Sequence, residues 1–285
     1  MKYLNVGCGA VFHPSWINVD MISYCSEVQA CDLRKGIPYP DQYFDACYSS
    51  HVLEHLTPDE AVPFFKECSR VLKPSGILRI VVPDLEAICR QYLHTLETAS
   101  TDSKAEANYD WMILELFDQT VRHVSGGEMK NYLTSSNIPN KDFIVSRLGS
   151  IAETINCQNE QSNGPSIWEK ISSRKPSYIA SYVLNKIQIN TAKMLVSVVA
   201  GSDSRKAFEE GLFRNSGEIH RWMYDSFSLS RLFKECGFID IQKCLPEESR
   251  IPDFRDYELD VIDGKVRIPQ SLFMEGIKPS FKSSD

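Results

Sequence analysis

The sequence lacks a long hydrophobic run, a basic run and a pair of closely spaced cysteines. Its longest apolar stretch near the middle, residues 194–200, is far too short to span a bilayer. The net charge is −7, whereas proteins that neutralise a phosphate backbone usually carry a basic patch. We therefore expect neither a membrane span nor a nucleic-acid partner.

The nine cysteines are odd in number and show neither C-x-x-C spacing nor the rhythm of metal ligands. Cys47 and Cys89 lie in apolar runs, where a free thiol behaves as a small hydrophobic side chain. This usage is typical of a reducing compartment. The chain also enters a strand-like run at once, which leaves no room for a signal peptide. We predict a soluble, cytoplasmic protein.

The first 85 residues alternate short strand patterns with turn or helix patterns. Apolar spacing predicts a helix over residues 58–72, with acidic residues in its first turn, and a β-branched run predicts a buried strand over 76–82. Further strands are predicted at residues 3–6, 16–20 and 44–49. Strands separated by helices predict an α/β fold with a parallel, doubly wound sheet.

The middle of the chain, residues 86–215, has a different pattern. We interpret it as a helical insertion that forms a lid on the substrate side. The residues at either end, 1–85 and 216–285, would form the core. Helices are predicted at 87–96, 109–121, 178–199 and 225–236, a linker at 157–176, strands at 238–242 and 271–278, and a turn at Asp263-Gly264.

Candidate binding residues follow the first two strands. Gly7 and Gly9 allow a ligand to approach the backbone closely, since no Cβ intervenes. Asp20 ends the second strand, where an acid can accept both hydroxyls of a ribose. Taken singly, a tight turn and a solvated acid explain these residues equally well. The dinucleotide fingerprint is broken, because Phe12 occupies the place of its third glycine.

Taken together, these features resemble class I S-adenosylmethionine (SAM)-dependent methyltransferases, especially a bacterial group found among surface-glycan genes. The resemblance covers residues 1–85 and 217–278. It implies a mostly parallel seven-stranded sheet with an antiparallel last strand, and SAM as the cofactor, with S-adenosylhomocysteine as product. The matching segments are residues 4–9, 16–20, 31–33, 44–45, 50–56, 70–78, 220–225, 228–229, 237–238 and 271–275.

The resemblance also assigns roles by position. Asp20 would hold the ribose hydroxyls, Asp32 would accept from the adenine amino group, and the Leu33 amide would donate to the adenine ring. The methionine and ribose side of SAM would be lined by Gly7, Cys8 and Gly9, and its sulfonium end by Ser49, Ser50 and His51.

Two features depart from the family pattern. Asn5 stands where an acid is common at the start of the glycine motif. The crossover from residue 9 to 16 is too short for a full helix, because parallel crossovers usually need a dozen residues or more. We therefore expect an unusual pocket at the methionine end of SAM.

His51, Glu54 and His55 form an H-x-x-E-H motif with three interpretations. An inverted zinc-protease motif is disfavoured because the residues follow a sheet strand. The motif also resembles the E-x-x-E-H magnesium site of some methyltransferases, but Mg²⁺ prefers oxygen to the His51 nitrogen. We favour the third interpretation, in which His51 lies near the cofactor and Glu54 and His55 are structural or line the pocket. We predict no bound metal.

His220 precedes the last core helix, beside Arg221, Trp222 and Tyr224. It could be a general base next to an aromatic platform for a sugar-like acceptor. Equally, the segment could pack the insertion on the core, with Asp225 as a helix cap.

His123 is a weaker candidate of the same kind, for which a solvated helix end is the favoured interpretation.

The predicted reaction is attack of an acceptor oxygen, or less readily nitrogen, on the methyl group of SAM, with His220 or His51 as base. The acceptor would be a small molecule or a saccharide, and the resemblance favours a sugar or glycan hydroxyl. The alternatives are an NAD-dependent oxidoreductase, a SAM- or glycan-binding module without catalysis, and a small-molecule N/O-methyltransferase of other metabolism. No pattern indicates an oligomeric state.

Overall fold

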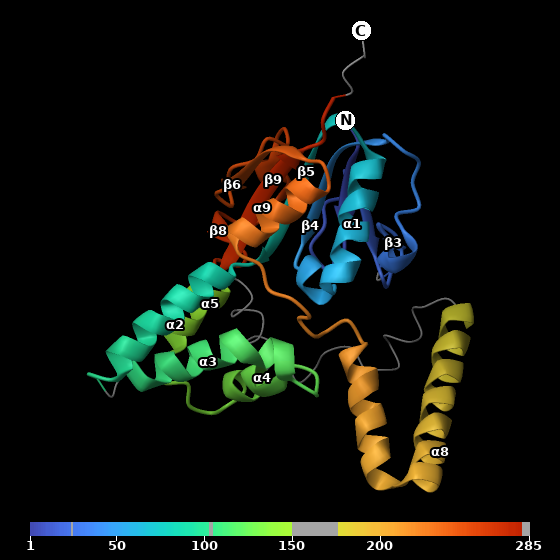
Figure 1. Cartoon of the computed structure of the whole chain (residues 1–285), viewed down its shortest axis with the longest axis vertical. Helices are drawn as coiled ribbons and strands as arrows, with labels where there is room; N and C mark the ends of the chain where they lie inside the picture. The colour runs from blue at the N-terminus through green and yellow to red at the C-terminus, as the bar shows by residue number, and fades with distance from the viewer. Residues whose placement is uncertain (24, 103–104, 150–175, 281–285) are drawn as a thin grey trace.

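The computed structural model describes residues 1–23, 25–102, 105–149 and 176–280. The core of the protein is a seven-stranded sheet with the order β3-β2-β1-β4-β5-β9-β6, in which only β9 runs antiparallel to its neighbours (Figure 1). This confirms the predicted fold class. The strands are β1 (Tyr3–Val6), β2 (Ile17–Asp20), β3 (Val28–Ala30), β4 (Phe44–Ser50), β5 (Leu72–Pro83), β6 (Ile239–Cys244) and β9 (Ser271–Ile277).

Helices α1 (Pro58–Val71) and α9 (Ser226–Glu235) lie together against one face of this sheet (Figure 1). Helix α1 begins with a capping box, in which Thr57 N donates to Glu60 Oε2 at 2.9 Å. Its buried face is the one predicted from the apolar spacing, except that Leu72 already begins β5, where it pairs with Phe44. The buried residues of α1 are Ala61, Phe64, Phe65, Cys68 and Val71.

The opposite face is covered by aromatic side chains rather than by a long helix. Trp16, from the short crossover between β1 and β2, packs edge-on against Tyr48 and Phe254. Phe254 belongs to a single helical turn, η4 (Phe254–Tyr257). A small hairpin, β7 (Val261–Ile262) and β8 (Lys265–Val266), follows η4 and turns at the predicted Asp263-Gly264.

A fully buried arginine joins the antiparallel strand to the rest of the sheet. Arg79 on β5 lies opposite Glu275 on β9, and its Nη1 donates to Glu275 Oε1 at 2.9 Å. Its Nε donates to Asp260 Oδ2 at 2.8 Å. The guanidinium therefore holds β9 and the segment before the β7–β8 hairpin against β5. Such a buried network is stable only while each charge keeps its partners.

Four helices build a second apolar cluster beside the sheet: α2 (Leu85–Ala99), α3 (Glu106–Val121), α4 (Gly127–Leu133) and α5 (Lys141–Leu148). The chain leaves and rejoins the core at one place, because Leu85 N donates to Tyr224 O at 2.9 Å and Asp84 forms a bridge with Tyr224. The predicted linker at 157–176 lies almost wholly outside the described residues.

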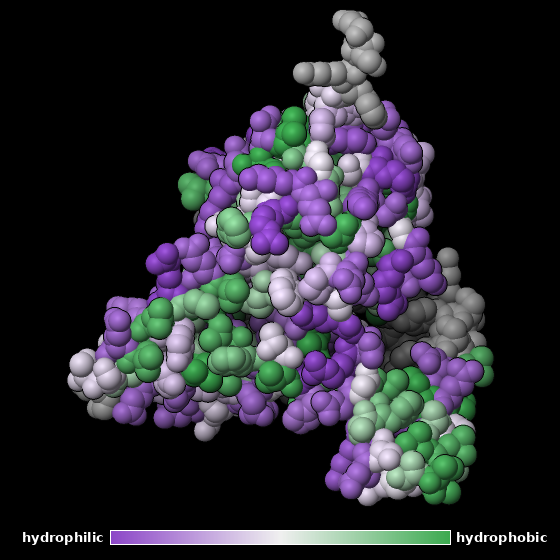
Figure 2. Space-filling view, viewed as in Figure 1, coloured by the Kyte–Doolittle hydropathy of each residue, from purple (hydrophilic) through white to green (hydrophobic). Residues whose placement is uncertain are grey.

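Helix α8 (Pro176–Arg214) is a hairpin of two helical arms, because Gly201 has φ 86° and ψ 175° and interrupts the helix (Figure 1). The first arm matches the helix predicted over 178–199. Its apolar side chains are largely exposed, among them Val198 at 76%, and they form the hydrophobic patch on the hairpin in Figure 2. In the described ranges, no helix is long and apolar enough to cross a membrane.

We predict that Arg79→Met lowers the free energy of unfolding by about 3–5 kcal/mol, because it removes the buried cation between Asp260 and Glu275 and leaves Glu275 with only the partly exposed Arg250. Urea unfolding followed by circular dichroism measures the loss. The matched control is Arg90→Met, which breaks a largely exposed pair with Glu86 and should change stability little. Similar losses in the two variants would contradict the role of the buried network.

Candidate cofactor and acceptor site

The turn after β1 is held by hydrogen bonds to β2. The amides of Gly7 and Cys8 both donate to Val19 O, at 2.8 and 3.2 Å. Gly9 N donates to Asp20 Oδ2 at 2.8 Å. All three amides therefore have partners inside the protein. A ligand at this turn would contact the glycine Cα surface and the Asp20 carboxylate rather than free amides.

The two glycines of the turn are required for different reasons. Both have positive φ, 70° for Gly7 and 53° for Gly9. A Cβ on Gly7 would lie 2.2 Å from Val52 Cγ2, whereas a Cβ on Gly9 would meet nothing within 4 Å. Gly7 thus permits close packing, and Gly9 borders open space. Between them, burial raises the pKa of the Cys8 thiol to about 12, so Cys8 stays protonated at neutral pH.

The unusual Asn5 has a structural explanation. Its Nδ2 donates to Val11 O and to Asn18 Oδ1, each at 3.2 Å. Asn18 Nδ2 in turn donates to the carbonyls of His13 and Trp16, both at 3.0 Å. The two side-chain amides hold the short β1–β2 crossover, which contains no helix, as predicted. An aspartate at position 5 could not donate these bonds.

Asp32 and Leu33 follow β3 at the same edge of the sheet as Asp20. Asp32 caps the single turn η1 (Leu33–Lys35), and its Oδ1 accepts from Arg34 Nε at 2.8 Å. The hydrogen bond from Arg34 is the main reason that the pKa of Asp32 is lowered. An adenine amino group would therefore share this carboxylate with Arg34. The sequence-based prediction did not include the contact between Asp32 and Arg34.

The three residues predicted at the sulfonium end lie where β4 ends. Ser49 Oγ is buried and has no hydrogen-bond partner among the residues that the structure describes. Ser50 Oγ accepts from Arg267 Nη2. His51 takes a left-handed conformation with φ 55°, fixed by its N–H donating to Val81 O at 2.9 Å. Among the described residues, the Ser49 hydroxyl therefore has no partner that would compete with a ligand, whereas the Ser50 hydroxyl is bound to Arg267.

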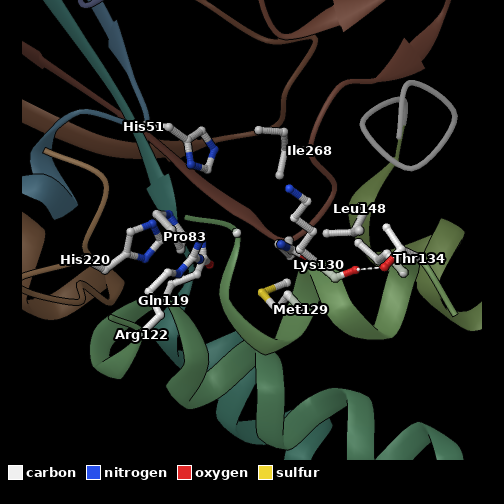
Figure 3. A pocket seen from close by; sticks show the side chains of 13 residues that line it. His51, Pro83, Gln119, Arg122, Met129, Lys130, Thr134, Leu148, His220 and Ile268 are labelled. Carbon is white, nitrogen blue, oxygen red and sulfur yellow. Dashed lines mark hydrogen bonds between the residues drawn. The ribbon is translucent and has the colours of Figure 1, made fainter. Parts of the chain in front are cut away.

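Next to His51 a cavity of about 380 Å³ opens between the sheet and the helical cluster (Figure 3). His51 and His220, the two predicted catalytic residues, both line it. Its walls combine apolar side chains with amides, a hydroxyl and two cationic groups. The remaining lining residues are Pro83, Gln119, Arg122, Gly126, Met129, Lys130, Leu133, Thr134, Leu148, Ile268 and Gln270.

His220 reaches this cavity from the coil before α9. Its backbone N–H donates to Gln119 O at 2.9 Å, which ties the coil to the end of α3. Its side chain is almost fully buried. Burial lowers the pKa of His220 to about 4, although the nearby Glu54 carboxylate opposes the shift. The imidazole is therefore neutral at pH 7 and able to accept a proton, although weakly basic.

Glu54 lies at the centre of the histidines, with no exposed surface. Burial would raise its pKa, but His51, His55 and His220 outweigh burial and lower the pKa of Glu54 to about 2. The Glu54 carboxylate is therefore charged at neutral pH. Glu54 belongs to the short 3-10 turn η2 (Leu53–His55), so the H-x-x-E-H motif does not lie on an α-helix, as the zinc-protease interpretation requires.

One feature of the predicted acceptor platform is wrong. Tyr224 is buried at 4% exposure in the main core cluster, because its backbone pairs with Asp84 at the end of β5. Only Trp222, at 49% exposure, presents its ring to solvent, in a hollow beside Arg221.

The flanking predictions agree with the structure. Asp225 caps α9, with Ser228 N donating to Asp225 Oδ1 at 2.7 Å. His123 is exposed beyond the end of α3.

Most of the cavity wall was not predicted from the sequence. Gln119, Arg122 and Lys130 come from the helical segment, and Gln270 from the residues before β9. None belongs to a motif. The only local signal is Gly126-Gly127, two residues with positive φ that form the turn between α3 and α4.

Comparisons with known proteins give one family match. Residues 4–80 match the family model of a methyltransferase domain. No curated protein sequence matches the chain.

Among solved structures, a protein of Pyrococcus horikoshii is 25% identical over 31% of this chain and 52% of its own, with a TM-score of 0.26. The 1,6-didemethyltoxoflavin-N1-methyltransferase of Burkholderia thailandensis, solved with S-adenosylhomocysteine, is 18% identical over 29% of this chain and 45% of its own, with a TM-score of 0.25. A SAM-dependent methyltransferase of Thermotoga maritima, described as a possible histamine N-methyltransferase, is 13% identical over 97% of this chain and 82% of its own, with a TM-score of 0.36. This chain spans only 38% to 52% of the length of the first four solved structures that it matches.

The two glycines give a prediction that separates packing from ligand binding. Gly7→Ala should destabilise the protein strongly, because its Cβ overlaps Val52. Gly9→Ala should cost only about 1–2 kcal/mol of left-handed backbone strain, while it weakens S-adenosylhomocysteine binding by filling the open space beside the turn. Thermal unfolding and calorimetry on both variants test this. Unchanged affinity in folded Gly9→Ala would place the cofactor elsewhere.

The strand order, the single antiparallel strand and the family match converge on one assignment. The glycine turn and the acids after β2 and β3 occupy the carboxyl edge of the sheet, where ligands bind in open α/β folds. Residues 4–80 match the methyltransferase-domain model, and the seven-stranded sheet with one antiparallel strand is that of a Rossmann-like methyltransferase fold, which supports SAM as the cofactor.

Proposed function

We propose that this protein transfers the methyl group of SAM to an oxygen of a small-molecule or saccharide acceptor held in the cavity beside His51. The observation that supports this most is that His51 and His220, which precede and follow the helical segment 86–215 in the sequence, line one cavity at the carboxyl edge of the sheet. His51 directly follows Ser49 and Ser50, the residues predicted at the sulfonium end of SAM.

The proposed mechanism relies mainly on alignment. SAM carries an activated methyl group, so the protein has to bring the acceptor oxygen in line with the carbon–sulfur bond and accept a proton. The neutral His220 imidazole is available for that proton. Because its pKa is lowered to about 4, it is a weak base, and positioning would supply the larger part of the rate enhancement.

The cavity wall favours a polar acceptor with an apolar face. Gln119, Gln270 and the Thr134 hydroxyl can hydrogen-bond to acceptor hydroxyls, while Met129 and Ile268 offer apolar contact. A sugar combines both properties, and this supports a saccharide acceptor within the proposal.

We also place the helical segment 86–215 on the acceptor side. Helices α3 and α4 supply much of the cavity wall, Arg122 and Lys130 among it, while residues 1–85 supply only His51 and Pro83. Arg122 is already paired with Asp118 and Glu218, at 3.5 and 3.1 Å, so Lys130 is the more available cation for an acceptor.

We predict that the protein binds SAM and S-adenosylhomocysteine in calorimetry and does not bind NAD. Asp20→Asn should weaken S-adenosylhomocysteine at least tenfold, because it keeps an oxygen for Gly9 N but loses the charged acceptor for the ribose. Asp263→Asn, in the turn of the β7–β8 hairpin, is the matched control and should bind normally. If folded protein bound neither sulfur compound, or bound NAD instead, the proposed function would be wrong.

The acceptor side has its own test, a screen of saccharides and nucleotide-sugars with methyl-labelled SAM. With the acceptor so found, Thr134→Trp should raise its KM at least tenfold, because the indole enters the cavity. The adjacent Ser135 is also exposed but does not line the cavity, so Ser135→Trp should leave KM unchanged. Both variants should bind S-adenosylhomocysteine like the unmodified protein. Equal KM values in the two variants would place the acceptor outside this cavity.

A further inference from the structure

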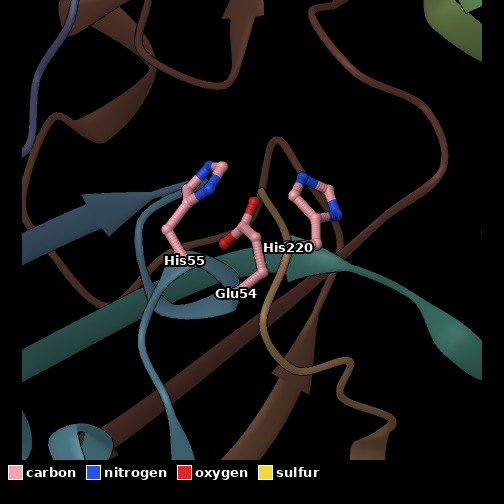
Figure 4. A group of neighbouring side chains, drawn as sticks. All are labelled: Glu54, His55 and His220. Carbon is pink, nitrogen blue, oxygen red and sulfur yellow. The ribbon is translucent and has the colours of Figure 1, made fainter. Parts of the chain in front are cut away.

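The Glu54 carboxyl group is buried between two imidazole rings, those of His55 and His220 (Figure 4). In the described part of the chain, neither carboxylate oxygen has an aligned hydrogen-bond donor. His51 Nδ1 lies 2.9 Å from Oε1 and pairs with it when the His51 ring is protonated, and Oε2 has no such partner in the described part of the chain. A buried carboxylate without such partners is costly, and a bound cation is one of the groups that can compensate it.

The two rings each have a nitrogen atom close to the Glu54 carboxylate. One ligand atom each of Glu54, His55 and His220 lie within 4.8 Å of one another. The rings of His55 and His220 are 5.0 Å apart between centroids and nearly perpendicular, at 79°. Atoms that share one Zn²⁺ at its usual bond lengths lie roughly 3.5 Å apart. Small side-chain rotations would therefore bring the three groups to bonding distance.

The hydrogen bonds around the cluster orient these groups. His55 Nδ1 lies 3.1 Å from Ile219 O. Because a carbonyl can only accept, Nδ1 carries the proton, and Nε2 keeps its lone pair. Metal-binding histidines are typically held in this way, with the second ring nitrogen donating to a carbonyl. His51 supports the position of the Glu54 carboxylate without being one of the three groups. Its Nε2 lies 2.9 Å from Ser271 Oγ, and its Nδ1 faces Glu54.

We propose that Glu54, His55 and His220 bind a divalent transition-metal ion of the kind that accepts imidazole and carboxylate ligands, such as Zn²⁺, Fe²⁺ or Mn²⁺. Two nitrogens and one oxygen suit these ions better than Mg²⁺, which prefers oxygen alone. This ligand set differs from the H-x-x-E-H triplet of the sequence, because His220 takes the place of His51, which becomes a supporting residue.

The ion would lie where it could take part in methyl transfer. This part of the inference rests on the proposed function. His220 lines the acceptor cavity, and three protein ligands leave a coordination position open for a further oxygen. An acceptor hydroxyl bound there would lose its proton to solvent more easily. Its oxygen would bond to the methyl carbon as the carbon–sulfur bond breaks, which releases S-adenosylhomocysteine. With the ion bound, His220 would be a ligand and not the base, and the ion would take over the activation of the acceptor hydroxyl.

The test is a titration of the full-length protein, freed of metal by a chelator and dialysed, with Co²⁺ followed by visible absorption and with Zn²⁺ followed by calorimetry. We expect one ion per chain. Glu54→Gln and His220→Gln should each weaken binding at least a hundredfold, and His51→Gln about ten- to a hundredfold. His123→Gln, an exposed histidine outside the cluster, should bind like the unmodified protein.

Circular dichroism and thermal unfolding establish that each variant is folded, and three variants at different positions keep the test independent of any one that fails to fold. Absence of a stoichiometric ion in the unmodified protein, or normal affinity in folded Glu54→Gln or His220→Gln, would overturn the proposal. The same samples are titrated with S-adenosylhomocysteine. Binding of that compound without the metal contradicts the metal site alone, and binding of metal without that compound contradicts the proposed function alone.

Discussion

The buried Glu54 connects the sheet core to the part of the chain that returns from the helical cluster. Its backbone oxygen accepts from Arg221 N at 2.7 Å and Trp222 N at 3.2 Å, while its side chain faces His55 and His220. The turn after β4 thereby determines where residues 219–222 run. Because these residues also contact α3 through Gln119, the same turn determines how the helices lie over the sheet edge. The cavity depends on this contact, since His51 and His220 would otherwise lie apart.

The core was predictable because its signals are local. The apolar spacing of α1 reports its buried face directly, and the short run before Gly7 can only be a strand that ends in a turn. The sequence shows that Asn5 and the short crossover are both unusual. It does not show that Asn5 holds the crossover in place, because only the folded chain brings Asn5 against Val11 and Asn18. The resemblance supplied the antiparallel position of the last strand, which its apolar pattern alone does not indicate.

Features that depend on distant partners were not predictable. Arg79 interrupts an apolar strand, and only the pairing with β9 shows that Glu275 and Asp260 neutralise it. Tyr224 was placed beside Trp222 on an exposed platform, but its backbone pairs with Asp84 and its ring enters the core. In α8 the spacing predicted a helix correctly, yet apolar side chains such as Val198 and Met194 stay exposed. The spacing of apolar residues predicts that a helix has an apolar face, but it does not predict whether another part of the protein covers that face.

The two sides of the candidate site differ in how far their residues could change without unfolding the protein. On the proposed cofactor side, hydrogen bonds and close packing hold Gly7, Gly9 and Asp20 to β2 and its neighbours, so cofactor binding and folding would constrain the same atoms. On the proposed acceptor side, Lys130 and Thr134 are exposed at α4, whose buried residues belong to an apolar cluster separate from the main core of the sheet. Under the proposed function, selectivity for the acceptor would therefore change through substitutions in α3 and α4, while Gly7, Gly9 and Asp20 stay the same.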